Sequence, residues 1–313
     1  MKKYKRILLF VVIFILIAPY LISSEFTYDI LEKPFSNSMF YKTNKDVSIH
    51  TRISQPTQEI KGQIVMIHGL GASTYSFRNQ SEPLAQAGYF VVAVDLPAFG
   101  YSDRQKGIDH SQLARADMLW QVLDQIEDEY SLDDKWHLMG HSMGASTVLA
   151  LSNQRPHDVL KLILIAPAIT QDNNSIGWLL KSPLGEWLKV YLRYFAINES
   201  SFARLLKSAS NQPVSDDMIK GYLDPLKIKG TNQALLDLLS SAKNVLIQDW
   251  TSNQTPVLII WGEQDDWVSF DQIDRIIPYV DDLTLLTLKD EGHLAHEMAY
   301  QQVNTKIIDF LNP

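Results

Sequence analysis

The sequence predicts an α/β protein in which a mostly parallel central sheet is covered by helices on both faces and carries a helical cap insertion. Short apolar runs typical of buried strands alternate with longer segments of helical periodicity, which is the pattern of a parallel sheet. One stretch of about eighty residues interrupts this alternation and contains no convincing strand. With 313 residues and 46% hydrophobic content, the chain is long enough to bury a large core.

The amino terminus has the pattern of a membrane-directed segment. Basic residues at 2, 3, 5 and 6 precede an apolar run that begins at Ile7 and ends before the polar residues at 23–25. Such a segment indicates export or membrane insertion, with its positive end in the cytoplasm and the folded domain that follows it on the extracytoplasmic side. Residues 1–24 are therefore predicted to be a membrane anchor or a signal segment.

Length and composition leave two outcomes open for this segment. About sixteen apolar residues at about 1.5 Å each cover about 24 Å, short of a bilayer core of about 30 Å. A retained anchor and a cleaved signal peptide, which would leave the protein secreted, both fit. Leu21-Ile22-Ser23 offers only one small residue for a cleavage site, which favours the anchor. A helix buried in the domain would leave the basic residues unexplained.

The core that contains the sheet is predicted in two parts, residues 25–167 and 253–313. Its first two strands, 38–41 and 47–54, are joined by the polar turn 43–46, which predicts an antiparallel hairpin. Helical segments are expected at 111–129 and 145–153. The later strands are expected at 64–67, 90–94, 136–139, 161–165, 257–261 and 283–288.

The stretch 168–252 is predicted to be a helical cap over the site, because so long a structureless loop is improbable within a compact domain. It is rich in tryptophan, tyrosine and leucine, including Trp187 and Tyr191. Three roles for these side chains stay open: packing of the cap onto the core, an apolar acyl or aryl pocket, and an interfacial face that dips into lipid beside the anchor.

The most informative motif is Gly-His-Ser-Met-Gly at 140–144, which lies between a predicted strand and a predicted helix. Glycines two residues before and two after Ser142 permit a turn too tight for larger neighbours, so that the hydroxyl projects from the backbone. The amino-terminal end of the following helix favours negative charge at the same point. Ser142 is therefore a candidate nucleophile.

A serine nucleophile needs a base and an orienting acid, and both candidates follow later strands. Asp265 lies in the turn after strand 257–261, and His293 lies in the loop after strand 283–288. Open parallel sheets place their sites at such strand ends. The spacing from Trp261-Gly262 favours Asp265 over the adjacent Asp266, and His296 is expected to pack or cap a helix rather than to catalyse.

With two further loops, these motifs resemble the α/β-hydrolase superfamily, in the branch with a single helical cap. The loops are His-Gly-Leu-Gly at 68–71 and Asp-Leu-Pro-Ala-Phe-Gly-Tyr-Ser at 95–102. The resemblance implies that Ser142 is the nucleophile, Asp265 the acid and His293 the base. It also implies an oxyanion hole formed by the backbone N–H groups of Leu70 and Met143. Ala98 departs from the family, which usually has a second glycine there, and this puts the backbone angles of that turn in question.

The remaining histidines have simpler interpretations. His68 and His141 belong to motifs whose histidines are generally structural in similar proteins, and we expect them to shape the loops beside the oxyanion hole. The others have no motif around them and are expected in the core or on the surface: His50, His110, His137 and His157.

Bulk composition excludes several classes of partner and chemistry. The formal net charge is -8 with no basic stripe beyond the first six residues, so a nucleic-acid partner is not expected. The absence of cysteine excludes disulfides and thiolate chemistry. No metal-ligand spacing or glycine-rich phosphate loop is present, so neither a metal nor a cofactor is expected. The sequence leaves the oligomeric state open.

The function expected from these residues is hydrolysis of a carboxylic ester, either a small molecule or a lipid, through an acyl-serine intermediate. Cleavage of carbon–carbon bonds, amides or peptides by the same triad is an alternative. Serine at 142 disfavours epoxide hydrolases and haloalkane dehalogenases, which the resemblance would give an aspartate there. A non-catalytic interaction protein on the same fold is a further alternative, disfavoured by the complete triad.

Overall fold

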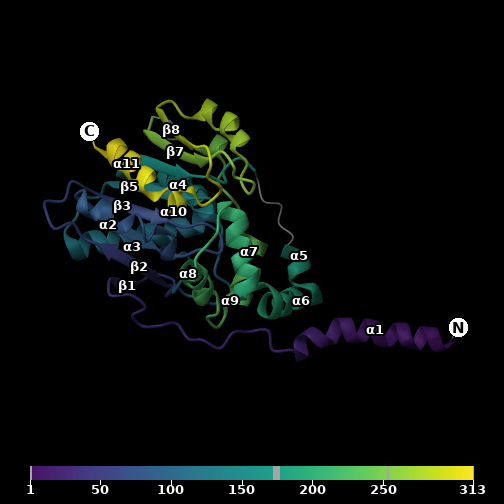
Figure 1. Cartoon of the computed structure of the whole chain (residues 1–313). Helices are drawn as coiled ribbons and strands as arrows, with labels where there is room; N and C mark the ends of the chain where they lie inside the picture. Colours follow the sequence, from purple (N-terminus) through teal and green to yellow (C-terminus); the bar gives the residue numbers. More distant parts are fainter. Residues whose placement is uncertain (1, 172–176, 252–253, 313) are drawn as a thin grey trace.

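The computed structural model describes residues 2–171, 177–251 and 254–312, which are arranged around one eight-stranded sheet (Figure 1). The order of the strands is β1-β2-β4-β3-β5-β6-β7-β8. Strand β2 pairs antiparallel with β1 and β4, while all other neighbours are parallel. The predicted hairpin and the mostly parallel sheet are thus confirmed. The strands are β1 (Ser38–Lys42), β2 (Ser48–Ser54), β3 (Gly62–Ile67), β4 (Tyr89–Val94), β5 (Trp136–His141), β6 (Val159–Ile165), β7 (Val257–Gly262) and β8 (Leu283–Leu288).

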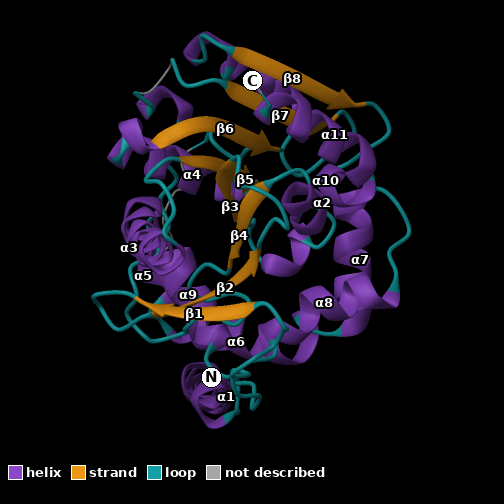
Figure 2. Ribbon diagram, turned by 90° about the vertical axis from the view of Figure 1, so that its left-hand side faces the viewer, coloured by secondary structure: helices purple, strands orange, loops and turns teal. Residues whose placement is uncertain are grey.

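Helices cover both faces of the sheet, as Figure 2 shows for α3 on one side and α2 and α11 on the other. In β3, Val65 and Ile67 belong to the core on one face, and Ile64 and Met66 belong to the core on the other. This alternation follows from the two-residue period of a strand. The helices of the two layers are α3 (Gln112–Tyr130) and α4 (Met143–Gln154), and α2 (Ser81–Gln86), α10 (Ala295–Met298) and α11 (Tyr300–Leu311).

A helical insertion lies between β6 and β7, and its described residues contain no strand of the sheet. Side chains cap two of its helices, since Asn198 accepts from the amide of Ser201 and Ser215 from that of Met218. Residues 252 and 253, at the predicted second boundary of the cap, lie outside the described residues. The insertion contains α5 (Gly177–Leu180), α6 (Pro183–Tyr191), the π-helical turn η3 (Leu192–Ala196), α7 (Glu199–Ser210), α8 (Asp216–Leu226) and α9 (Thr231–Ser241).

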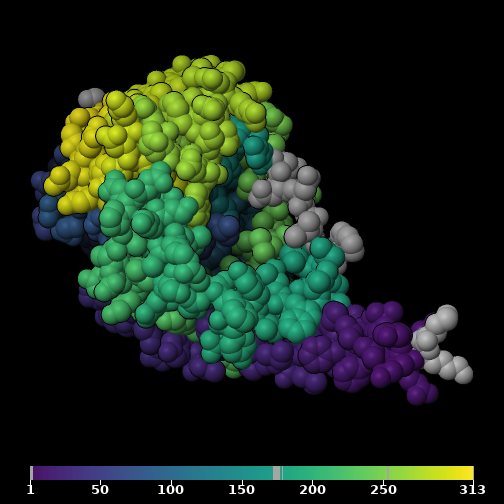
Figure 3. Space-filling model, turned by 45° about the vertical axis from the view of Figure 1, so that its right-hand side comes forward, coloured from purple at the N-terminus to yellow at the C-terminus, as the bar shows by residue number. Residues whose placement is uncertain are grey.

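The amino-terminal helix α1 (Lys2–Leu21) extends from the body of the molecule beside α6 (Figures 1 and 3). Its 20 residues span about 30 Å, more than the apolar run alone predicts, because the helix includes the basic residues and continues past Pro19. By length and mean hydropathy of 2.0, the segment Lys3–Leu21 is able to cross a membrane. Only 11% of its most apolar window is buried, so α1 is not a core helix.

The cap contacts α1 at an interruption in the helical hydrogen bonds. Pro19 has no N–H, so the carbonyl of Ile15 cannot receive the usual bond from four residues later. The indole Nε1 of Trp187 on α6 donates to this carbonyl at 2.9 Å. Two turns further along the cap, the hydroxyl of Tyr194 donates to the carbonyl of Ser23, also at 2.9 Å. The end of α1 is therefore joined to the cap by polar as well as apolar contacts.

Candidate active site

Ser142 occupies a strained turn between β5 and α4. Its backbone has φ 52° and ψ −117°, in the left-handed half of the backbone map, where a residue with a side chain is strained. A Cβ at Gly144 would lie 2.2 Å from the carbonyl oxygen of Ile67, and one at Gly140 would lie 2.5 Å from that of Gly144. Both flanking glycines are thus required by close backbone contacts, which accounts for the motif.

Asp265 and His293 are brought together from the loops after β7 and β8. The Oδ2 atom of Asp265 lies 2.7 Å from Nδ1 of His293, and both residues are 4% exposed. The Oδ1 atom accepts from the amides of Trp267 and Val268, each at 2.9 Å. Asp266, the alternative acid, is exposed. The carboxylate is therefore fixed on one side by the backbone and oriented toward the imidazole on the other.

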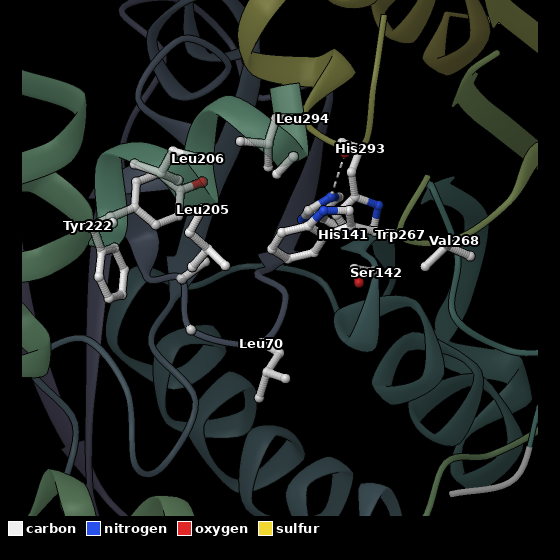
Figure 4. Close-up of a pocket in the computed structure, with 14 residues that line it drawn as sticks. Leu70, His141, Ser142, Leu205, Leu206, Tyr222, Trp267, Val268, His293 and Leu294 are labelled. Atoms are coloured by element: carbon white, nitrogen blue, oxygen red, sulfur yellow. Dashed lines mark hydrogen bonds between the residues drawn. The ribbon is translucent and has the colours of Figure 1, made fainter. Parts of the chain in front are cut away.

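Ser142 and His293 line the same cavity, which has a volume of about 170 Å³ (Figure 4). Its other walls are mostly apolar and come from the loop after β3, from α7 and α8 of the cap, and from the loops after β7 and β8. In the described part of the chain, the hydroxyl of Ser142 makes no hydrogen bond to His293. Such bonds are often long before a substrate binds. The two groups thus share a wall of the cavity that a carbonyl carbon could reach.

Two backbone amides near Ser142 are available as donors. Met143 is the first residue of α4, so its N–H has no partner within the helix. Leu70 lines the cavity, and neither amide donates to another group among the described residues. A Cβ at Gly69 would lie 3.1 Å from Cβ of Ser142, which shows how closely this loop approaches the serine.

Two of the motif histidines have structural partners. The Nδ1 atom of His68 lies 2.7 Å from the carbonyl oxygen of Gly69, and its Nε2 accepts from the amide of Leu96 at 3.0 Å. Burial lowers the pKa of His68 to about 4. His141 donates through Nε2 to the carbonyl of His293 at 2.9 Å. These contacts fit the expectation that both histidines shape the loops of the site.

His296 is fully buried and packs rather than facing the cavity. Its ring lies 4.4 Å from the ring of His141, centroid to centroid, and 5.7 Å from that of Phe77. Burial and the neighbouring His293 lower its pKa to about 3, so the ring is neutral at pH 7. This agrees with the packing role expected for it.

The other histidines also follow the simple expectation. His110 and His137 are buried, whereas His157 is exposed. Burial lowers the pKa of His110 to about 3 and that of His137 to about 4. The described residues contain no group of three or more histidine, aspartate or glutamate side chains that could hold a metal ion.

His50 belongs to a second serine–histidine–aspartate arrangement that the sequence analysis missed. Its Nε2 lies 2.7 Å from Oγ of Ser38, and its Nδ1 lies 2.7 Å from Oδ2 of Asp95. Asp95 also accepts from the backbone amides of Thr74 and Tyr101. All three side chains are buried, so this arrangement ties β1, β2 and the loop after β4 together.

Ala98 stands where the family usually has a second glycine. It adopts φ 79°, the left-handed conformation that a glycine would take without strain. The turn therefore keeps its shape despite the substitution, at the cost of local strain.

A buried polar network beside the cavity was not predicted either. Tyr222 of α8 lines the cavity and donates its hydroxyl to the carboxylate of Glu297, which also pairs with Arg78. Burial raises the pKa of Tyr222 well above its usual value, and the nearby Glu297 carboxylate adds to the shift, so this hydroxyl keeps its proton. The network connects the cap to the core, and no local pattern announces it because its members are far apart in the sequence.

Comparison with known proteins places this geometry in a family. Residues 63–299 match the family model described as the alpha/beta hydrolase fold. The chain belongs to the α/β-hydrolase fold family. The match covers the strained serine turn, the loop that contains Leu70 and the loops that hold Asp265 and His293, so this hydrolase carries its candidate site within the family's own region.

Individual relatives of this α/β hydrolase are distant. It is 25% identical over 252 residues to the uncharacterized hydrolase YugF of Bacillus subtilis, covering 79% of this chain and 89% of that protein. It is 26% identical over 265 residues to a 2-hydroxy-6-oxononadienedioate/2-hydroxy-6-oxononatrienedioate hydrolase of Cupriavidus pinatubonensis, covering 79% of this chain and 86% of that protein.

A solved structure shares the fold over the whole chain. It is a membrane phospholipase A described as a bacterial virulence factor, with a TM-score of 0.70 and 19% identity, covering 100% of this chain and 98% of that one. At this identity, the likeness shows the fold alone.

Proposed function

We propose that this α/β hydrolase cleaves carboxylic esters through an acyl-serine intermediate at Ser142. The observation that carries the proposal is the convergence of three features at one small cavity. These are a serine on a strained turn, a histidine whose Nδ1 is held 2.7 Å from a buried carboxylate, and two backbone amides without protein acceptors beside the serine. Together they supply a nucleophile, a base with its orienting acid, and an oxyanion hole.

In the first half of the proposed reaction, Nε2 of His293 takes the proton of the Ser142 hydroxyl. At the same time, Oγ of Ser142 attacks the carbonyl carbon of the ester. Asp265 favours this tautomer, because its carboxylate accepts from Nδ1–H and stabilises the imidazolium that forms. The carbonyl oxygen becomes an oxyanion and accepts from the amides of Leu70 and Met143. His293 then gives its proton to the departing alcohol, which leaves an acyl group on Ser142.

In the second half, a water molecule takes the place of the alcohol. His293 removes a proton from the water, the resulting hydroxide attacks the acyl carbon, and the same two amides hold the second oxyanion. Collapse of this intermediate breaks the bond to Oγ of Ser142. The proton on His293 returns to the serine, and the acid is released.

Charge around the cavity favours esters over the carbon–carbon substrates of some relatives. The name of the Cupriavidus pinatubonensis relative gives it a substrate with two carboxylates, which calls for cationic partners. No arginine or lysine is among the described residues that line the cavity at Ser142. Arg78 is paired with Glu297, and Arg193 stacks over Phe26. A neutral ester therefore suits this cavity better than a dicarboxylate.

We further propose that α1 is retained as a membrane anchor, with the catalytic domain on the extracytoplasmic side. The support is the contact between Trp187 and the carbonyl of Ile15, which Pro19 leaves without a helical partner. An unpaired carbonyl costs several kcal/mol within a bilayer, and neighbouring elements usually satisfy it. A segment that is cleaved and lost would have no need of a partner in the folded cap.

Hydrolysis of p-nitrophenyl esters by Ser142→Ala tests the proposed reaction. We expect the variant to lose at least about a thousandfold in kcat, because removal of a triad member commonly has this effect. Ser38→Ala is the matched control, since Ser38 forms the same kind of contact to a histidine but lies buried away from the cavity. Substantial ester cleavage by folded Ser142→Ala would refute the mechanism.

A further inference from the structure

We infer that a second cavity, lined by the cap, binds the hydrocarbon chain of the substrate's acyl group, and that this chain enters from the membrane. The inference rests on the proposed function, because it assumes that the ester carbonyl lies at Ser142. It names the substrate class as long-chain lipid esters.

The second cavity is larger than the catalytic one and adjoins it. Its volume is about 470 Å³, against about 170 Å³ at Ser142. Four residues line both cavities: Leu70, Gly71, Phe202 and Leu205. Leu70 lies at this boundary, and its amide is one of the two proposed oxyanion donors. A carbonyl held there leaves its acyl chain next to the opening of the second cavity.

The lining suits a hydrocarbon and few other ligands. The walls come from α6, η3, α7, α8 and α9, and most of the residues are leucine or another apolar type. Phe202, Leu226 and Leu238 form a buried inner surface. Arg204 and Ser201, which are polar, are hydrogen-bonded to each other. A polar ligand would lose its hydration here with few partners in exchange, whereas a methylene chain gains from burial.

The same helix that lines the second cavity contacts α1. Tyr191 lines the cavity and is exposed, and it lies one helical turn after Trp187, on the same face of α6. Trp187 donates to the carbonyl of Ile15, six residues before the end of α1, which corresponds to about 9 Å along the helix axis. If α1 spans a bilayer, this part of the cap is placed at the depth where interfacial tryptophan and tyrosine are favoured.

Exposed apolar side chains near this contact extend the argument. Leu184, Tyr194 and Phe195 are each more than half exposed, and Phe195 stacks on Tyr191 with ring centroids 6.0 Å apart. Figure 3 shows the amino-terminal helix against the segment that contains α6. A lipid chain leaving the bilayer beside α1 would therefore meet apolar surface up to the exposed edge of the second cavity.

An obstruction of the second cavity tests the inference with the full-length protein in detergent micelles. Leu239 lines this cavity but not the catalytic one, and Leu239→Trp would fill part of the space. We expect kcat/KM for p-nitrophenyl palmitate to fall at least tenfold, and that for the acetate to change less than twofold. Each methylene excluded from an apolar site costs about fourfold, or about 0.8 kcal/mol.

Two further variants complete the design. Leu113→Trp is the matched control, because Leu113 is exposed on α3 of the core and lines neither cavity. Leu235→Trp, one turn before Leu239 on the same face of α9, is an independent obstruction if Leu239→Trp does not fold. Vesicles of palmitoyl-oleoyl phosphatidylcholine test the membrane as the source of the chain. We expect the wild type to release fatty acid from them, and Leu239→Trp to do so at least tenfold more slowly.

The outcomes separate this inference from the proposed function. An unchanged chain-length profile in folded Leu239→Trp would overturn it, as would equal losses on acetate and palmitate. Cleavage of p-nitrophenyl palmitate without release from vesicles would overturn entry from the membrane. Failure of the proposed function itself would appear differently, as ester cleavage that persists in Ser142→Ala.

Discussion

Replacement of Asp265 by asparagine separates its proposed part in catalysis from its part in the fold. Asparagine keeps a carbonyl oxygen that can accept from the amides of Trp267 and Val268. Its NH2 group would then face Nδ1 of His293, where a carboxylate oxygen now lies at 2.7 Å. Two donors cannot pair, so the imidazole is driven to the tautomer with its proton on Nε2, which cannot accept a proton from Ser142.

The expected effects of Asp265→Asn on catalysis and on stability differ in magnitude. A wrong tautomer in a serine triad lowers kcat by about 10⁴-fold, equivalent to about 5 kcal/mol in the activation barrier. The free energy of unfolding should fall by only about 1.5–3 kcal/mol, the contribution of one hydrogen bond to a charged group. We therefore expect Asp265→Asn to be folded and nearly inactive, as measured by steady-state kinetics beside urea denaturation.

The neighbouring aspartate supplies the control. Asp266→Asn makes the same chemical change one residue further along, at an exposed position, and should leave kcat within about twofold of the wild type. The reasoning fails if folded Asp265→Asn keeps kcat within tenfold of the wild type. It also fails if Asp266→Asn loses as much activity as Asp265→Asn.

Two further predictions concern pH and the amino terminus. Burial lowers the pKa of His137 to about 4, so the unfolded chain binds more protons than the folded chain below about pH 6.5, and stability should fall on acidification. The loss of stability attributable to His137 is about 2 kcal/mol at pH 5. We therefore expect the urea midpoint to change less between pH 7.5 and pH 5 in His137→Gln than in the wild type. An equal change in the two proteins would contradict this prediction. Protein extracted from membranes should have an intact mass that includes α1 and should resist a carbonate wash; a mass that begins after Leu21 would contradict retention.

The sheet could be predicted from sequence because each strand is a local apolar run. All eight strands form where they were predicted, with ends that lie within two residues of the prediction. The helix after the serine begins at residue 143 rather than 145, because Ser142 itself occupies the position just before the first turn. The cap was predictable as helical, but the packing of its helices depends on contacts that have no local pattern.

The relation of Asp265 to His293 could be anticipated for a topological reason. Both residues follow neighbouring parallel strands, β7 and β8, so their loops emerge at the same edge of the sheet. By contrast, Tyr222 and Glu297 are 75 residues apart and meet only because α8 folds over α10. The contact of Trp187 with Ile15 joins residues 172 positions apart, and Pro19 was its only sign in the sequence.

The two serine–histidine–aspartate arrangements in this chain show why residue types alone do not identify a site. Ser38, His50 and Asp95 have histidine contacts of 2.7 Å on both sides, tighter than anything between Ser142 and His293. Yet Ser38 lies in a regular strand, with no strained turn and no helix amino terminus beside it. Among the described residues, these three line none of the cavities discussed above.

The comparison indicates what a catalytic serine requires beyond its partners. Ser38 is buried and lines neither cavity, so no carbonyl carbon can approach its hydroxyl. At Ser142 the strained backbone turn places the hydroxyl at an open cavity, and the amides of Leu70 and Met143 have no acceptor among the described residues. A substrate carbonyl can therefore reach Ser142 from the cavity, whereas Ser38 is closed off from both cavities whatever its distance to His50.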